Sequence, residues 1–264
     1  MQTTDAAVCD DPLAAFYTDG LTLLETSGIP FLVGGTFAFA RHTNIDRPTK
    51  DLDIFVRPSD LKRTLSLFGD NGYETELTFP HWLAKISRGL WVIDLIFSSG
   101  NGIARVDDEW FAHAVEGVVL GKRLLLCPPE ELIWSKAFVL ERERYDGADV
   151  AHLLREAGRD IDWRRLLTRF GARWPVLFSH LTLFYFIYPD QRDVVPAGLM
   201  EELAGRLTRL RVEPENNVCF GTLLSREQYL PDLERHRYLD ARVNPYGSLT
   251  PDEVRTWTEA IEKQ

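Results

Sequence analysis

The chain has 264 residues, 45% of them hydrophobic and 27% charged, a composition that allows one large globular domain or two small ones with a buried core. The formal net charge of −10 argues against a duplex-DNA footprint, because phosphate neutralisation by basic side chains supplies most of the affinity of such proteins. Three widely spaced cysteines argue against a disulfide framework or a zinc cluster and suit the reducing cytoplasm: Cys9, Cys127 and Cys219.

The first predicted elements alternate between helix and strand. The segment Met1 to Pro12 is acidic and has neither a basic start nor an apolar stretch, so we expect no signal peptide. Apolar residues then recur at helical spacing over residues 12–27. A short strand at Phe31–Val33 follows, which ends at Gly34-Gly35, and a second helix begins at Thr36.

The remainder of the first half alternates between strands and one helix. Residues 51–56 alternate apolar and polar side chains, which predicts a strand. A helix is expected from Pro58-Ser59 to near Gly69. Further strands are predicted at residues 83–87, 91–97 and 117–127, the last as a β-hairpin that turns at Gly121-Lys122.

After Pro128-Pro129 the pattern becomes helical. Helices are predicted over residues 130–144, 147–157, 162–170, 174–188 and 196–211. The apolar stretch at residues 174–188 is shorter than the roughly 20 residues of a bilayer span, so we expect a buried helix and no membrane segment. Residues 212–264, with turn signals at Pro214, Pro231 and Asn244-Pro245, remain unassigned, with a lid packed on the helices favoured over a nucleic-acid contact. The predicted fold is thus mixed α/β (α+β): a core domain over residues 1–128 and a helical domain with an irregular tail over residues 129–264.

Three carboxylates stand out against this pattern. Asp51 and Asp53 are two residues apart in a predicted strand, so their side chains share one face, where they repel each other unless a cation lies between them. Asp94 lies within Trp91–Phe97, which is apolar on both faces, and an ionised group there is costly unless it is paired or metal-bound. Mg²⁺, or Mn²⁺, would remove these penalties and usually shares such a site with substrate phosphates. The alternatives are a solvated edge strand for the pair and a hydrogen-bonded buried acid for Asp94.

The residues just upstream suit phosphate binding. A turn at Gly34-Gly35 lets the backbone approach a phosphate, and a helix that begins at Thr36 offers free N–H groups and a positive dipole end. A tight turn without a ligand is the alternative.

This combination resembles the nucleotidyltransferase superfamily that includes DNA polymerase beta. The resemblance rests on Gly-Gly, the pair in Asp51-Leu52-Asp53-Ile54 and the single acid in Val92-Ile93-Asp94-Leu95, and it covers roughly residues 30–97. It implies a small mixed sheet flanked by helices and a metal-dependent transfer of a nucleoside monophosphate from an NTP, with Asp51, Asp53 and Asp94 as catalytic and metal-binding residues. The stretch Arg47–Asp53 resembles most the bacterial branch of type IV abortive-infection toxins.

Lys136 is a further candidate because it falls on the apolar stripe of the predicted helix 130–144. Either its stem snorkels outward or its ammonium meets an anion. In the toxins that the sequence resembles, a lysine after the core sheet contacts the triphosphate, which implies the same role for Lys136. Nearby, Asp146 is expected to cap the helix that begins at Gly147, and Asp149 to favour the positive end of that helix.

A cluster of basic and hydroxyl residues precedes the acidic pair and adds further candidates for nucleotide binding: Arg47, Thr49 and Lys50. The function expected is therefore a cytoplasmic, NTP-dependent nucleotidyltransferase. Its acceptor would be a tRNA 3′ end, as the toxin resemblance implies, a small antibiotic-type molecule or a protein. The alternative function is a non-catalytic nucleotide-binding protein, against which the complete set of three carboxylates argues.

Overall fold

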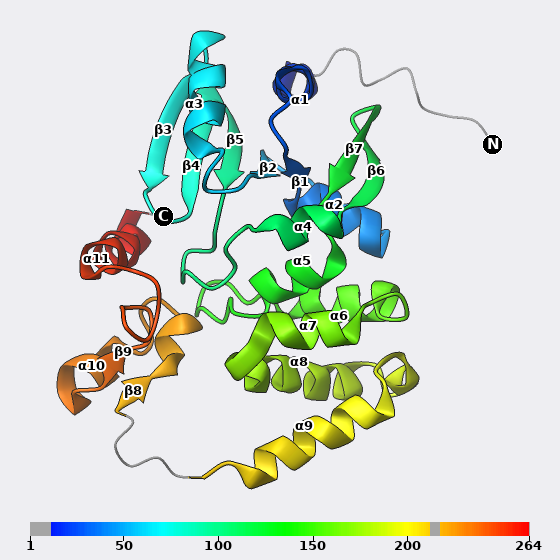
Figure 1. The fold of residues 1–264 in the computed structure, drawn as a ribbon, viewed down its shortest axis with the longest axis vertical. Coiled ribbons are helices and arrows are strands. Elements are labelled where there is room, and N and C mark those ends of the chain that lie inside the picture. The colour runs from blue at the N-terminus through cyan, green and yellow to red at the C-terminus, as the bar shows by residue number, and fades with distance from the viewer. Residues whose placement is uncertain (1–11, 212–216, 264) are drawn as a thin grey trace. The chain divides into compact units, whose positions relative to one another are not determined.

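The computed structural model describes residues 12–211 and 217–263 (Figure 1). The predictions for Met1–Asp11, Cys9 among them, and for the turn at Pro214 lie outside these ranges. The chain divides into two compact units. The first holds the described residues up to Arg41 together with Ile45–Ser99 and Arg105–Pro128, and the second holds His42–Asn44, Gly100–Ala104 and the described residues from Pro129 onward.

The first unit is built on a seven-stranded mixed sheet with the strand order β3-β4-β5-β2-β1-β7-β6. β2 pairs in parallel with β5, β1 pairs in parallel with β7, and the other neighbours are antiparallel. The strands are β1 (Leu32–Val33), β2 (Asp51–Phe55), β3 (Glu74–Phe79), β4 (Leu83–Arg88), β5 (Trp91–Ile96), β6 (Val115–Val119) and β7 (Lys122–Leu126). The predicted fold class, a mixed sheet flanked by helices, is confirmed.

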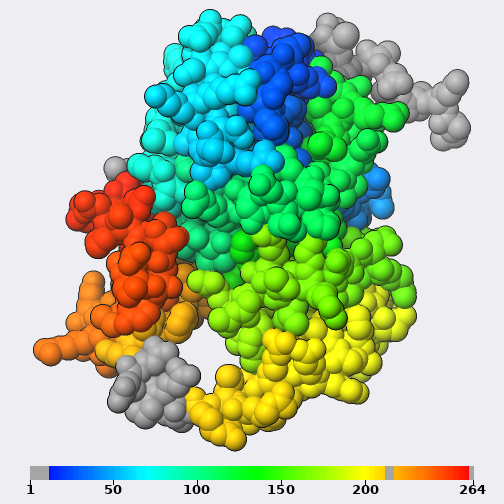
Figure 2. Space-filling model, in the orientation of Figure 1, coloured from blue at the N-terminus to red at the C-terminus, as the bar shows by residue number. Residues whose placement is uncertain are grey.

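The helices of this unit are α1 (Pro12–Ser27), α2 (Gly35–Thr43), α3 (Leu61–Asp70) and α4 (Asp108–Ala112). α1 and α3 lie side by side, and Figure 2 shows the dark blue of α1 bordering the cyan of α3. Gly20 of α1 lies so close to β5 that a Cβ on it would be 2.7 Å from Ile93 Cδ1. Ile93 and its neighbours Leu52, Ile54 and Leu95 are fully buried. Because strand residues alternate between faces, the carboxylates of β2 and β5 lie on the face away from α1 and α3.

The second unit begins with packed helices: α5 (Pro129–Lys136), α6 (Gly147–Ala157), α7 (Trp163–Phe170), α8 (Trp174–Ile187) and α9 (Ala197–Arg209). α5 and α8 each contact both α6 and α7, and α9 lies along α8 (Figure 1). The fully buried carboxylate of Glu131 on α5 joins α7 through Arg165 and Arg169 Nε, at 2.5 and 2.9 Å. Truncating one member of such a buried pair is costly, so α5 is held rigidly.

The tail of the second unit contains α10 (Leu230–His236), α11 (Pro251–Glu259) and two short parallel strands, β8 (Val218–Cys219) and β9 (Leu239–Asp240). Two short parallel strands therefore accompany the helices of the C-terminal region. Arg242, 1% exposed, holds this tail together through Asp240. The described cysteines, Cys127 and Cys219, are free thiols. Along the described chain, no helix combines the length and apolar character needed to cross a bilayer.

Two local predictions are wrong, and two elements are missed. The helix predicted over residues 130–144 ends at Lys136, because Leu140 N donates to Leu224 O and Glu141 N to Arg144 O instead of to helical carbonyls. The hairpin turns one residue early, at Leu120 and Gly121, which both have positive φ. The edge strand β3 is missed because its outer residues are exposed on both faces, which leaves no alternation to detect, and the five-residue α4 is too short to show a period.

Candidate active site

The register of β2 and β5 brings two of the three predicted carboxylates together. Asp53 on β2 is the direct parallel partner of Asp94 on β5, and Asp51 is the partner of Val92. Since directly paired strand residues point to the same face, the carboxylates of Asp53 and Asp94 are neighbours, with Asp51 one pair further along that face.

Asp94 has an unusual environment for an acid. Its side chain is 17% exposed, and its Oδ1 is buried without a hydrogen-bond partner. Lys85 on β4 is its antiparallel partner, with Nζ 3.9 Å from Oδ1. Burial raises the pKa of Asp94, the charge of Lys85 opposes this rise, and the negative charge of Asp51 adds to it. The site therefore resists carrying its full negative charge unaided.

The two glycines lie directly beside Asp53. Gly34 N donates to Asp53 O at 2.9 Å, which ends the pairing of β1 with β2. Gly35 begins α2 with φ +50, and a Cβ on it would lie 1.7 Å from Asp53 Oδ2. The N–H groups of the first turn, which include that of Thr36, have no helical carbonyl to bond, so the positive end of α2 lies next to the Asp53 carboxylate.

The residues between α2 and β2 are arranged around Asp51. Thr49 Oγ1 lies 2.9 Å from Asp51 Oδ1 and 2.8 Å from Asp51 O, so its one proton is shared between them. The guanidinium of Arg47 stacks over Phe39 of α2, 4.5 Å from the ring centroid. Arg47 and Lys50 are exposed. Thr49 thus orients Asp51, whereas the two cations face solvent.

Lys136, at the end of α5 in the second unit, meets anions rather than snorkelling. Its Nζ lies 2.8 Å from Asp149 Oδ2 and 3.5 Å from Asp146 Oδ2, and its side chain is 17% exposed. Asp146 precedes α6 but makes no side-chain cap; its carboxylate is held by Arg144 at 2.9 Å. Burial works to raise the pKa of Asp146, but the hydrogen bonds and charges of Arg144 and Lys136 together hold it below its ordinary value.

The carboxylate face meets some of the requirements of a divalent cation. Mg²⁺ prefers oxygen ligands, and Asp94 Oδ1 is a buried oxygen without a hydrogen bond next to Asp53. Within residues 12–211 and 217–263, no three Asp, Glu, His or Cys side chains are gathered closely enough to form a complete metal site. Asp51 is the acid engaged elsewhere, through Thr49. Asp53 and Asp94, which are direct partners in the sheet, supply oxygen donors of the kind a hard cation prefers.

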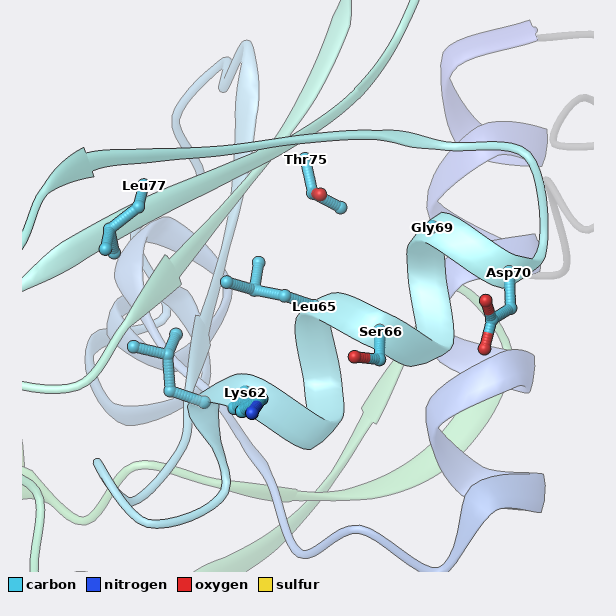
Figure 3. A pocket seen from close by; sticks show the side chains of 8 residues that line it. Lys62, Leu65, Ser66, Gly69, Asp70, Thr75 and Leu77 are labelled. Atoms are coloured by element: carbon cyan, nitrogen blue, oxygen red, sulfur yellow. The ribbon is translucent and has the colours of Figure 1, made fainter.

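A separate hollow of about 430 Å³ lies on the opposite side of the sheet (Figure 3). It is lined by Leu61, Lys62, Leu65, Ser66, Gly69 and Asp70 of α3, and by Thr75 and Leu77 of β3. None of the three predicted catalytic acids lines it. It is a groove between a helix and an edge strand, and we assign it no part in the chemistry.

Lys85 is the residue of this face that sequence reasoning missed. Its strand, residues 83–87, was predicted, and a lysine in the middle of Leu83-Ala84-Lys85-Ile86 was the available signal. Its significance depends on the pairing of β4 with β5, which a single sequence does not display.

Comparison with known proteins agrees with this architecture. A family model described as an uncharacterised nucleotidyltransferase matches residues 21–181, more than half of the chain. No curated protein matches the chain.

Several solved structures are similar to this chain at low identity. The solution structure of the antibiotic-resistance factor ANT(2'')-Ia is 14% identical, with 73% of this chain and 97% of that chain covered and a TM-score of 0.41. The lincomycin-bound lincosamide antibiotic adenylyltransferase LnuA is 16% identical, with 54% and 96% covered and a TM-score of 0.38. An antigenic nucleotidyltransferase-like protein from Paracoccidioides brasiliensis is 15% identical, with 66% and 93% covered and a TM-score of 0.37. These likenesses concern the fold alone. The model of the uncharacterised nucleotidyltransferase family matches more than half of the chain, and the chain therefore belongs to that family.

Proposed function

We propose that the protein transfers a nucleoside monophosphate from an NTP to an acceptor hydroxyl at the face formed by β2 and β5. The observation that carries the proposal is the placement of Asp53: it is paired with Asp94 on one side and touched by the start of α2 on the other. Carboxylates that hold a cation, beside N–H groups that hold phosphate, are the two parts that nucleotidyl transfer needs.

In this proposal the three acids share the chemistry. Asp51, Asp53 and Asp94 would hold Mg²⁺ or Mn²⁺, and the bound ion would offset their repulsion and the negative charge of the phosphate oxygens. Asp94 accepts the proton of the acceptor hydroxyl. The hydroxyl oxygen attacks the α-phosphorus of the NTP, and pyrophosphate leaves. Asp94 is assigned as the base because its Oδ1 has no hydrogen-bond partner and so can accept that proton.

The backbone and the cations take the triphosphate. Gly35 and Thr36 offer N–H groups at the start of α2. The N–H of Gly34 is bonded to Asp53 O, so Gly34 would contribute to the phosphate site only through its lack of a side chain. Arg47 and Lys50 are exposed and able to reach a γ-phosphate, while Thr49 orients Asp51. Lys136, which pairs with Asp149 and Asp146 of its own unit, is the further candidate for the triphosphate that the resemblance implies.

The candidate acceptors are a tRNA 3′ end and small antibiotic-type molecules. The resemblance to type IV abortive-infection toxins favours a tRNA 3′ end. The net charge of −10 favours an acceptor that needs no long basic surface. An aminoglycoside and a lincosamide belong in the test panel, because adenylyl-2''-tobramycin and lincomycin are the molecules bound in two of the similar structures.

The test incubates the full chain with each α-labelled NTP, Mg²⁺ or Mn²⁺, and tRNA, the two antibiotics or a cell extract. We expect label in one acceptor fraction, lost in Asp53→Ala and retained in Asp70→Ala, an exposed acid in the groove of α3. Label transfer that survives Asp53→Ala would contradict the proposal. Nucleotide binding without transfer to any acceptor would favour the non-catalytic nucleotide-binding alternative.

A further inference from the structure

Lys85 stands in a row of charged residues that crosses the sheet. The register pairs Lys85 of β4 with Asp94 of β5, and Asp94 with Asp53 of β2. Asp53 O in turn accepts from Gly34 N. The order along the row is therefore Lys85, Asp94, Asp53 and Gly34, so that the lysine and the start of α2 flank the acids from opposite sides.

The ammonium of Lys85 lies near a carboxylate oxygen of Asp94 that has no hydrogen-bond partner. Lys85 Nζ lies 3.9 Å from Asp94 Oδ1, which is buried without a hydrogen bond. Glu76 of β3 is the other cross-strand neighbour of Lys85. The distance to Asp94 is at the long end for an ion pair, and the lysine side chain is 42% exposed. A contact of this kind offsets charge but is weak enough to be exchanged.

We propose that Lys85 is a positioning residue that offsets the charge of Asp94 while the site is without metal and gives up this contact when a divalent cation binds. The inference rests on the proposed function in assuming a cation at Asp53 and Asp94. The inference goes beyond the proposed function because it assigns the control of metal affinity to Lys85, which is not one of the three acids. The physical reason is electrostatic competition: two cations that share one carboxylate oxygen repel each other, so the lysine weakens metal binding.

The test measures Mn²⁺ affinity of the full chain by the electron paramagnetic resonance signal of free Mn²⁺, at constant pH and ionic strength and without substrate. Lys85→Met is expected to bind Mn²⁺ about twofold to fivefold more tightly than the unchanged protein, the range for a partly exposed ion pair. Lys85→Gln should behave in the same way. Lys85→Arg, which keeps the charge, should stay close to the unchanged protein.

Two controls separate this contact from a general effect of charge. Lys62→Met removes one positive charge from the groove on the other side of the sheet and should leave Mn²⁺ affinity unchanged. In an Asp94→Asn background, Lys85→Met should have no further effect, because the partner carboxylate is gone.

The inference is overturned if Lys85→Met binds Mn²⁺ no more tightly than the unchanged protein, if Lys62→Met gives the same gain, or if the chain binds no Mn²⁺ at all. Failure of the proposed function looks different: Mn²⁺ affinity would follow the expected pattern while no acceptor receives labelled nucleotide. If Lys85 had only a structural role, Lys85→Met would change the free energy of unfolding without raising the affinity for Mn²⁺.

Discussion

The backbone of Gly35 touches the carboxylate of Asp53. A Cβ added to Gly35 would lie 1.7 Å from Asp53 Oδ2, and the residue has φ +50. Only glycine combines that backbone conformation with that approach. The structure therefore requires glycine at position 35. Because Gly35 has no side chain, the positive end of α2 lies next to Asp53, the acid at the centre of the proposed site.

Gly35→Ala should consequently lose both nucleotidyl transfer and stability, by about 1–3 kcal/mol, because it adds a steric clash to a strained φ. Urea unfolding and label transfer measure the two effects. Gly72→Ala is the matched control, since Gly72 has φ +77 with nothing within 4 Å of the added Cβ. Equal losses in the two variants would show that the approach to Asp53 has no energetic weight.

Asp94→Asn should abolish nucleotidyl transfer while stabilising the metal-free fold. Burial and the charge of Asp51 disfavour the ionised form of Asp94, and an amide of the same shape removes that cost. We expect a gain of about 0.5–2 kcal/mol in the free energy of unfolding at neutral pH. Asp160→Asn, at an exposed acid after α6, should change it by no more than about 0.5 kcal/mol. A clear loss of stability in Asp94→Asn would mean that its contact with Lys85 outweighs desolvation.

Glu141 joins the C-terminal tail to the loop between α5 and α6. Its carboxylate accepts from Ser225 Oγ at 2.7 Å and from the backbone and Nε of Arg226 at 3.1 Å. Beside it, Leu140 N donates to Leu224 O at 3.0 Å. The tail thus holds the loop that leads to the aspartate partners of Lys136.

Glu141→Ala should free this loop, because it removes charge-assisted hydrogen bonds that typically contribute about 1.5–3 kcal/mol each when one partner is ionised. Amide hydrogen exchange at Leu140 and Asp146 should become faster, and KM for NTP should rise if Lys136 contacts the triphosphate. Glu143→Ala, at an exposed position of the same loop, should leave exchange unchanged. Unchanged exchange in Glu141→Ala would rule out the tail as the support of this loop.

His180 predicts a pH dependence for the second unit. Burial lowers its pKa, partly offset by the hydrogen bond from Nε2, taken as protonated, to Ala137 O at 2.9 Å. Because the unfolded chain then binds the proton more readily, this contribution to stability is complete above pH 6.5 and is lost as the pH falls below it.

His180→Gln keeps an N–H donor for Ala137 O and has no proton to gain. Urea unfolding between pH 8 and pH 5 should therefore show a smaller loss of stability in this variant than in the unchanged protein. The difference between the two proteins should be constant above pH 7 and change only below 6.5. A parallel decline of both proteins through pH 6 would assign the pH dependence to other groups.

The local elements could be predicted where a short-range pattern carries them. The period-2 alternation of Asp51–Phe55 predicts β2, and the apolar run around Asp94 predicts β5. The helical spacing after Pro12 predicts α1 to its last residue. The same patterns fail where the stabilising contact is distant. The helix that includes Lys136 ends there because Leu140 bonds to Leu224, more than eighty residues later along the chain.

The sequence by itself determined β2 and β5, the types of side chain on them and the face shared by Asp51 and Asp53, because each follows from backbone geometry over a few residues. Only the tertiary structure decided that Asp94 lies beside Asp53, that Gly35 touches that acid and that Lys85 stands next in the row. Strand order and register depend on the packing of whole faces of the sheet, and no local spacing records them.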